Sequence, residues 1–358
     1  MLRLILSIIL LWMTWQLTAQ TSPARVVVDR ITPASLANQA GESTTRRATI
    51  YLPPGYDDEP DRAYPVIYYL HGFTWSDSLN LVVSRFDTLF DHAIRKGFIP
   101  PVIIVNADHH TRYRGSWYTN SSFTGNWDDF VTRDLVEHMD RNYRTLPHPQ
   151  SRGVTGHSMG GYGALRLGML HPDVFGIVYA LSPCPLDLDV ELGASSEWYR
   201  RLPEIEDRET LIEGWNEFGA NVLVSMGQAW TPNPKKPPFY ADVPFGYVND
   251  SLVVNDEVVA QWKEQMPLNM AVRYRENLAR LTALKIEWGR NDEFDLALGG
   301  RKFSEQLEAL GIHHYAEEFL GKHSDQLNQA YGRLTYEVLP FFSHHLQFAA
   351  PRDFHGNH

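Results

Sequence analysis

Short apolar runs alternate with longer amphipathic stretches along most of this chain. The apolar runs are typical of buried strands, and the stretches between them have the spacing of helices that bury one face. The predicted strands are residues 47–53, 66–70, 102–107, 151–155, 175–181, 284–288 and 315–320. The predicted helices are residues 84–96, 127–142, 159–171, 298–310 and 325–343. This alternation predicts an α/β fold with a mostly parallel central sheet and helices on both faces.

One long segment interrupts the alternation. Residues 185–275 exceed what a single crossover connection needs, and they are rich in large aromatic side chains. One interpretation is a cap over a site, in which Trp198, Trp215 and Trp230 bind substrate by stacking on a sugar or an aryl acid. The other is a small satellite core in which the rings pack on one another. The pattern does not choose between the two.

The stretch Gly156-His-Ser-Met-Gly-Gly161 matches G-x-S-x-G, the sharp turn that presents a serine nucleophile above a sheet. A predicted strand enters this turn and a predicted helix leaves it. The turn leaves no room for side chains where strand and helix meet, so the glycines have a steric reason. The sequence therefore predicts that Ser158 is the nucleophile of an enzyme.

A serine hydroxyl needs a base and an orienting carboxylate, in the chain order serine, acid, histidine. Asp292 follows the predicted strand at 284–288 and is the preferred acid, while Glu293 and Asp295 lie in the same loop and compete with it. His323 follows the strand at 315–320 and is the expected base. The remaining histidines, including His157 beside the nucleophile, are expected to be packed or solvated.

Backbone N–H groups are expected to stabilise the oxyanion of such a reaction. One is the amide of Met159, directly after the nucleophile, and the other is that of Phe73, after the strand at 66–70. The sequence carries no H-E-x-x-H motif, and its one cysteine cannot build a thiolate site, so neither a metal nor another cofactor is expected.

At this point the chain resembles the esterase branch of the α/β-hydrolase superfamily, which includes feruloyl esterases, esterase D-like S-formylglutathione hydrolases and the antigen 85 mycolyltransferases. The resemblance covers most of residues 44–345 and rests on four stretches, Tyr51-Leu-Pro-Pro-Gly-Tyr56, Tyr64-Pro-Val-Ile-Tyr-Tyr-Leu-His-Gly72, Gly115-Ser-Trp-Tyr118 and Gly156-His-Ser-Met-Gly-Gly-Tyr-Gly-Ala-Leu165. It implies the α/β-hydrolase fold, Ser158, Asp292 and His323 as a catalytic triad, and Phe73 and Met159 as oxyanion amides.

The function expected on this basis is hydrolysis of a carboxylic ester through an acyl-enzyme, with feruloyl or acetyl esters of carbohydrates as candidate substrates. An acyltransferase of the antigen 85 type uses the same triad and remains the nearest alternative. Peptidase activity is also chemically open. The alternative from another class is a non-catalytic carbohydrate-binding protein on a hydrolase fold, which an intact triad disfavours.

Residues 1–19 have the layout of a signal peptide, with Arg3, an apolar run and Ala19 before the expected cleavage point. A retained N-terminal anchor is the alternative; after cleavage no stable membrane association is expected. We expect a protein secreted or exported to a bacterial periplasm, with one hydrolase domain at residues 20–348 and a loose tail at 349–358. Its formal net charge of −11 disfavours nucleic-acid partners and leaves a small-molecule or carbohydrate-linked ester as the expected partner.

Overall fold

The structure is a computed structural model that describes residues 21–213 and 215–349. The expected signal peptide at residues 1–19 and the expected tail beyond residue 349 lie outside the described residues. Among the residues that are described, no helix combines the length and the apolar character that a membrane crossing requires.

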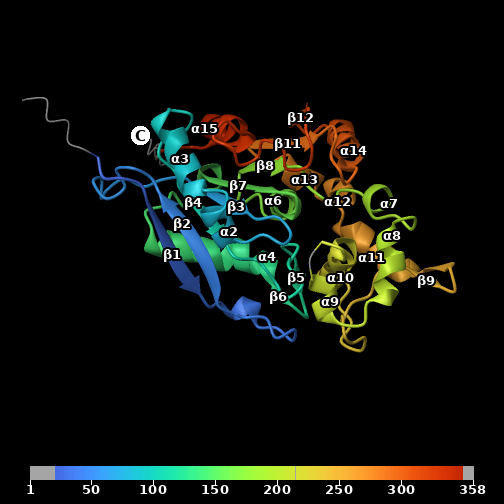
Figure 1. Cartoon of the computed structure of the whole chain (residues 1–358). Helices are drawn as coiled ribbons and strands as arrows, with labels where there is room; N and C mark the ends of the chain where they lie inside the picture. The colour runs from blue at the N-terminus through green and yellow to red at the C-terminus, as the bar shows by residue number, and fades with distance from the viewer. Residues whose placement is uncertain (1–20, 214, 350–358) are drawn as a thin grey trace, which may run out of the picture.

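Within this part of the chain, an eight-stranded sheet forms the centre of the molecule (Figure 1). In spatial order its strands are β1 (Arg25–Ile31), β2 (Arg46–Leu52), β4 (Ile103–Ala107), β3 (Val66–Leu70), β7 (Arg152–His157), β8 (Ile177–Leu181), β11 (Ala283–Gly289) and β12 (Tyr315–Phe319). The two pairings of β2 are antiparallel, and the pairings from β4 to β12 are parallel. The predicted mostly parallel sheet is confirmed.

The edge strand β1 is not among the predicted strands. Its apolar run is only Val26 to Val28, flanked by charged residues, and most of the strand is exposed or half-buried. It nevertheless pairs with β2 along its full length. An edge strand buries little of its surface, so it lacks the continuous apolar run that marks a central strand.

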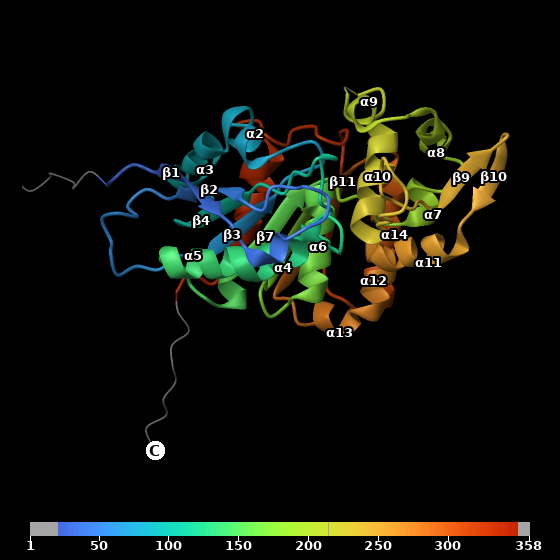
Figure 2. The same cartoon turned by 90° about the horizontal axis from the view of Figure 1, so that it is seen from below.

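Alternate side chains of the central strands supply two hydrophobic cores, one on each face of the sheet. In β3, Tyr68 belongs to one core and Tyr69 to the other. The first face is covered by α4 (Trp127–Asp129), α5 (Val136–Asn142), α6 (Met159–Leu170), α13 (Arg275–Leu278) and α14 (Leu296–Ala309), and the second by α2 (Asp77–Val82), α3 (Phe86–Arg95) and α15 (Leu339–His345). Figure 2 shows α2 and α3 on one side of the strands and α4 and α5 on the other.

Short segments complete the main domain. A π-helical turn at Phe130–Leu135 joins α4 and α5 into one run that matches the helix predicted at 127–142. The other short segments are η1 (Ala34–Leu36), the two-stranded pair β5 (Asn120–Ser121) and β6 (Gly125–Asn126), and η3 (Pro149–Ser151).

The last predicted helix, at 325–343, begins later than expected. Turns and bends occupy residues 323–332, and a π-helical turn at Leu334–Val338 leads into α15. Asp325 accepts a hydrogen bond from the backbone N–H of Lys322 at 2.9 Å, and Gln326 has a φ of 58°. Local side-chain bonding and a left-handed residue thus replace the first turns of the helix.

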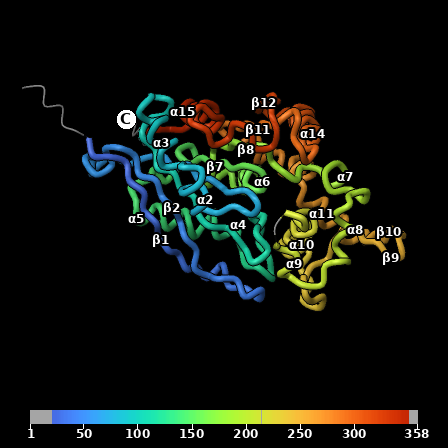
Figure 3. Tube along the Cα trace, viewed as in Figure 1, coloured from blue at the N-terminus to red at the C-terminus, as the bar shows by residue number. Residues whose placement is uncertain are grey.

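The insertion at residues 185–275 lies on the side of the molecule away from β1, where its hairpin projects (Figure 3). It comprises α7 (Leu188–Glu191), α8 (Glu197–Arg201), η4 (Leu202–Glu204), α9 (Arg208–Ile212), α10 (Phe218–Trp230), β9 (Phe245–Val248), β10 (Ser251–Val254), α11 (Asp256–Gln265) and α12 (Pro267–Arg273).

Helix α10 anchors this insertion to the main domain. Nearly all of α10 is buried, and Trp117 Nε1 donates a hydrogen bond to Ser225 Oγ at 2.8 Å. Side chains of the insertion, such as Leu223 and Trp262, belong to the same core as α6. A smaller cluster around Tyr113 forms a satellite core. The insertion is therefore built mainly into the principal core.

The closest backbone approach at the centre of the sheet joins β3, β7 and α6. A Cβ on Gly160 would lie 1.9 Å from the carbonyl oxygen of Leu70, and a Cβ on Gly156 would lie 2.4 Å from the same oxygen. No side chain fits at these distances, so the turn between β7 and α6 requires glycine at both positions.

Replacing Gly160 with alanine should therefore force α6 away from β3. We expect Gly160→Ala to destabilise the fold by roughly 1–3 kcal/mol or more, because the added methyl meets rigid backbone. Thermal unfolding followed by circular dichroism measures this as a lower midpoint. Gly246→Ala is the matched control, since a Cβ there has no atom within 4 Å. A Gly160→Ala protein as stable as that control would contradict the packing argument.

Candidate active site

Ser158 stands at the sharp turn between β7 and α6 in a backbone conformation that serine rarely adopts. Its φ is 60° and its ψ is −121°. The turn is held by hydrogen bonds from the Ser158 N–H to the Leu181 carbonyl at 3.0 Å and from the Tyr162 N–H to the Ser158 carbonyl at 2.9 Å. Backbone strain of this kind persists only where the surrounding structure enforces it, and it is common at catalytic residues.

His323 and Asp292 come together because β11 and β12 are parallel neighbours. Each residue follows the carboxyl end of its strand, so both lie at the same edge of the sheet. His323 Nδ1 is 2.8 Å from Asp292 Oδ2, and both residues are buried. The other carboxylate oxygen of Asp292 accepts the N–H of Phe294 at 2.9 Å. Asp292 thus binds the imidazole of His323 through Nδ1, and the other ring nitrogen, Nε2, is not bound by this carboxylate.

The two competing carboxylates lie in different environments. Glu293 Oε2 accepts the backbone N–H of His323 at 2.9 Å, so Glu293 contacts the main chain of the histidine loop rather than the imidazole. Asp295 is exposed, and it begins α14 with a φ of 58° and no capping hydrogen bond. Asp292 is the carboxylate of this loop that contacts the His323 ring.

His157 has a positioning role that the sequence interpretation missed. Its Nε2 is 2.8 Å from the backbone carbonyl of His323, and the two ring centres are 4.6 Å apart. Burial, and then the neighbouring His323, lower the pKa of His157 to about 3, so the ring is neutral and donates its Nε2 proton to that carbonyl. Its position at the end of β7, directly before the nucleophile, is the feature of the sequence that could have indicated a contact with the site.

Two cavities meet at Ser158, and His323 and Phe73 line both. The outer cleft has a volume of about 470 Å³ and is lined, beyond these residues, by Tyr69, Gly72, Thr74, Trp75, Asn80, His157, Trp215, Phe218, Glu293, Phe294, Ser324, Leu327 and Asn328. The inner cavity has a volume of about 50 Å³ and is lined by Trp117, Cys184, Pro185, Glu191, Leu192, Trp198, Phe218, Val222, Met226, Phe294 and Leu296.

The three tryptophans predicted to bind substrate are separated by the structure. Trp215 is 72% exposed and lines the outer cleft, where it packs on Phe218. Trp198 lines the inner cavity. Trp230 contacts Trp117, Tyr162 and Trp262 in the main core and lines neither cavity.

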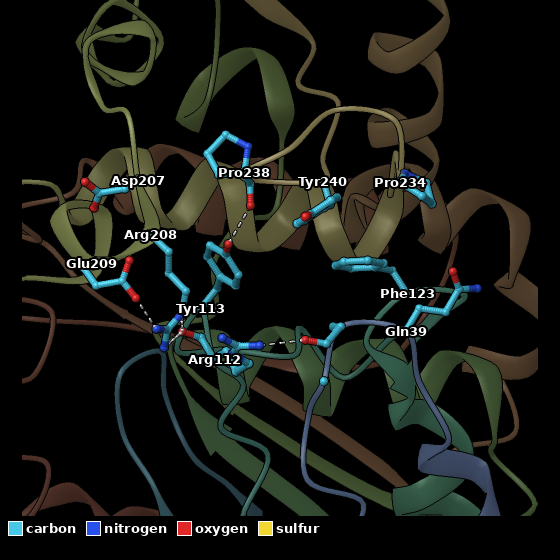
Figure 4. A pocket seen from close by; sticks show the side chains of 12 residues that line it. Gln39, Arg112, Tyr113, Phe123, Asp207, Arg208, Glu209, Pro234, Pro238 and Tyr240 are labelled. Atoms are coloured by element: carbon cyan, nitrogen blue, oxygen red, sulfur yellow. Dashed lines mark hydrogen bonds and ion pairs between the residues drawn. The ribbon is translucent and has the colours of Figure 1, made fainter.

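A hollow larger than either of these two cavities lies elsewhere. Figure 4 shows this pocket of about 670 Å³ between the loop that contains Arg112 and the insertion. Its polar groups bond to one another: Arg208 Nη2 donates to the Arg112 carbonyl at 3.1 Å, and the Tyr113 hydroxyl donates to the Pro238 carbonyl at 3.1 Å. None of Ser158, Asp292 and His323 lines it, so volume does not identify the reactive site.

A serine on a strained turn, next to a histidine that a carboxylate orients, can attack a carbonyl carbon. Met159 begins α6, so its N–H has no acceptor within the helix. Phe73 lines both cavities with Ser158.

Within residues 21–213 and 215–349, no three His, Cys, Asp or Glu side chains are grouped as metal ligands.

Comparison with known proteins places these features in a family. Residues 42–330 match the model of the family described as "Putative esterase". The esterase Rv1288 of Mycobacterium tuberculosis is 36% identical over 175 residues, which are 48% of this chain and 35% of that protein. The endo-1,4-beta-xylanase/feruloyl esterase of Xylanibacter ruminicola is 27% identical over 140 residues, 38% of this chain and 19% of that protein. The match thus spans about a third of the mycobacterial esterase.

Solved structures share the fold. A ferulic acid esterase superposes with a TM-score of 0.62 at 17% identity, covering 91% of this chain and all of that one. FphF, a fluorophosphonate-binding serine hydrolase of Staphylococcus aureus, superposes with a TM-score of 0.59 at 13% identity, covering 90% of this chain and 99% of that one. The family model spans well over half of the chain, and these neighbours share its architecture. The chain belongs to the family described as "Putative esterase" and has the α/β-hydrolase fold.

Proposed function

We propose that this protein is a secreted serine esterase that hydrolyses a carboxylic ester through an acyl-enzyme, with feruloyl or acetyl esters of carbohydrates as its substrates. Ser158 is the nucleophile, His323 the general base and Asp292 the residue that orients the base. The observation that carries the proposal is the 2.8 Å hydrogen bond between His323 Nδ1 and Asp292 Oδ2, next to a serine on a strained elbow.

The reaction has two steps, in which the acyl group is transferred first to Ser158 and then to water. Ser158 Oγ attacks the ester carbonyl carbon while His323 Nε2 takes the hydroxyl proton, and the proton then passes to the leaving alcohol as the carbon–oxygen bond breaks. Water then attacks the acyl carbon while the same nitrogen takes its proton, the bond from that carbon to Ser158 Oγ breaks, and the proton passes to Oγ as the acid is released. Ser158 Oγ lies 3.5 Å from Cys184 Sγ, and Ser158 and His323 together line both cavities.

The amide of Phe73 is oriented through the carbonyl of the preceding residue. The Gly72 carbonyl accepts hydrogen bonds from His71 Nδ1 at 2.9 Å and from the Trp75 N–H at 3.1 Å. A trans peptide directs its carbonyl and the next N–H in opposite directions, so the Phe73 N–H is turned away from these anchors. This geometry supports the Phe73 amide, with that of Met159, as the oxyanion hole.

His71 is held in the tautomer that this bond needs. Its Nε2 accepts the N–H of His109 at 2.8 Å, which leaves the proton on Nδ1. Burial lowers the pKa of His71, so the ring stays neutral. His71 is therefore a positioning residue that acts through the Gly72 carbonyl.

Export is part of the proposal. The supporting observation is the signal-like layout of residues 1–19. Detection of the protein outside the cytoplasm with a new N-terminus near residue 20 tests it.

Ser158→Ala should lower kcat by about 10⁴-fold or more, because it removes the nucleophile and leaves only the oxyanion hole and binding. The fluorophosphonate adduct of the unmodified protein should map to Ser158 by peptide mass spectrometry. Cys184→Ala should still be labelled, although its thiol lies beside the serine. Labelling of another residue, or a Ser158→Ala protein with normal turnover, would remove the assignment.

Asp292→Asn should lower kcat by roughly 10³–10⁴-fold, since an amide favours the wrong imidazole tautomer while keeping the shape. Glu293→Gln should cost far less, because its side-chain carbonyl can still accept the His323 N–H. Asp295→Asn is the exposed control. All three are assayed on one soluble ester after circular dichroism confirms folding. If Glu293→Gln were inactive while Asp292→Asn kept its activity, the carboxylate that orients the base would be Glu293 and not Asp292.

His71→Leu should lower kcat roughly 10–100-fold with a smaller change in KM, because the Gly72 carbonyl loses a donor and the oxyanion amide loses its orientation. His71→Asn should recover part of this loss, since the asparagine amide nitrogen can occupy the place of Nδ1. Thermal unfolding of both variants separates a loss of folding from a loss of turnover. Equal kcat in the two variants at equal stability would exclude the positioning role.

A further inference from the structure

The two cavities at Ser158 divide an ester substrate into two parts. In the acyl-enzyme the acyl group is bonded to Ser158 Oγ, while the alcohol leaves on the side from which water enters. Ser158 Oγ lies 3.5 Å from Cys184 Sγ, a residue that lines the inner cavity and not the outer cleft. The serine hydroxyl thus reaches the mouth of the inner cavity.

The inner cavity is small and its walls are packed. Its volume of about 50 Å³ compares with about 150 Å³ for a cavity that holds benzene, and with roughly 10–15 Å³ of probe volume for one water. A short aliphatic group fits this space and an aryl ring does not.

Several contacts hold these walls in place. A Cβ on Gly219 would lie 2.2 Å from the Trp198 ring, so the indole lies directly on the α10 backbone. Trp117 is bonded to Ser225, and Glu191 Oε1 accepts the N–H of Leu186 at 3.0 Å. The small volume is therefore fixed by packing on both sides, and it does not depend on one exposed side chain.

The inner cavity also lacks a counter-ion for an anionic acyl group. Among the described residues that line it, none is a lysine or an arginine. Glu191 is the carboxyl group in its wall, and its Oε2 is shielded from solvent with no hydrogen-bond partner in the described residues. Burial raises the pKa of Glu191 to about 8, so the wall is neutral at pH 7. Such an environment favours neutral acyl groups.

The outer cleft is larger and has more polar side chains in its walls. It is about 470 Å³ in volume, and it offers the polar side chains of Asn80, Glu293 and Asn328 together with the exposed ring of Trp215. Hydroxyl groups can hydrogen-bond to such side chains, and a sugar ring can pack on an exposed indole. A bulky, hydroxyl-rich alcohol fits there.

We propose that the inner cavity is an acyl pocket that restricts the enzyme to short neutral acyl groups, of the acetyl type, and that the outer cleft binds a bulky polar alcohol such as a sugar. This proposal rests on the proposed function and narrows it, because it excludes feruloyl and other aryl acids from the acyl position. Met226 and Val222 on α10, with Trp198 on α8, set the length that is accepted.

The test is a chain-length series of p-nitrophenyl esters with methyl ferulate added. The unmodified protein should show kcat/KM at least tenfold higher on the acetate than on the hexanoate, with little turnover of methyl ferulate. Met226→Ala removes part of the cavity wall and should raise the hexanoate-to-acetate ratio of kcat/KM about tenfold. Met139→Ala is the matched control, because Met139 is equally buried in the main core but lines neither cavity. It should leave that ratio unchanged.

A second comparison tests the alcohol side. Trp215→Ala should raise KM for glucose pentaacetate several times more than KM for p-nitrophenyl acetate, since only the sugar ester needs the indole. Equal changes on both would contradict the assignment of the outer cleft.

The outcomes separate this inference from the proposed function. Turnover of methyl ferulate or the hexanoate as fast as the acetate, with fluorophosphonate on Ser158, would overturn the acyl pocket and leave the esterase assignment intact. An unchanged ratio in Met226→Ala would also overturn the acyl pocket. Absence of labelling and of turnover on every ester would remove the proposed function itself.

Discussion

The contact of α6 with the carboxyl ends of β3 and β7 is the constraint on which the rest of the site depends. Because Gly156 and Gly160 lack side chains, the chain can reverse within a few residues and still pack α6 on the sheet. Ser158 is left at a φ of 60° at the turn between strand and helix. The bond from its N–H to Leu181 ties the strained residue to β8. The turn is therefore held by the sheet, and the free energy that the strain costs is offset by packing elsewhere.

The histidine loop is held at several points by side chains from the loop after β11 and from the end of β7. Asp292 contacts the ring of His323, Glu293 its N–H, and His157 its carbonyl oxygen. At the far end of the same loop, Arg333 Nε donates to Glu287 Oε1 at 2.6 Å, and both residues are buried. Breaking one side of a buried ion pair typically costs about 3–5 kcal/mol, so this pair ties the far end of the loop to β11.

The insertion is both a part of the core and a wall of the site. Trp230 and Trp262 pack in the main core, whereas Trp198 and Trp215 reach the two cavities. The interpretation as a cap over the site thus describes Trp198 and Trp215, and the interpretation as rings packed on one another describes Trp230 and Trp262. Helix α10 connects these roles, because its buried face binds Trp117 while Val222 and Met226 bound the inner cavity. Residues that set the size of the pocket are thus anchored by the core.

The sequence by itself determined the parallel sheet, the elbow around Ser158 and the loops that carry Asp292 and His323. These follow from short-range patterns, since apolar runs, glycine spacing and a residue's place after a strand are local properties. It did not reveal β1, whose apolar run is short and only partly buried, or the late start of the last helix, which local hydrogen bonds in the histidine loop delay.

Only the tertiary structure decided which residues share a contact across the chain. Asp292 contacts the His323 ring, Glu293 accepts the His323 N–H, and His157 donates to the His323 carbonyl. Each of these bonds joins segments that are distant in sequence, as does the bond from the His109 N–H to His71. The same holds for the division of Trp198, Trp215 and Trp230 among inner cavity, outer cleft and core. The periodicity of the sequence shows on which side of its own helix or strand a residue lies. The partner that this residue contacts depends on how the helices and strands pack together.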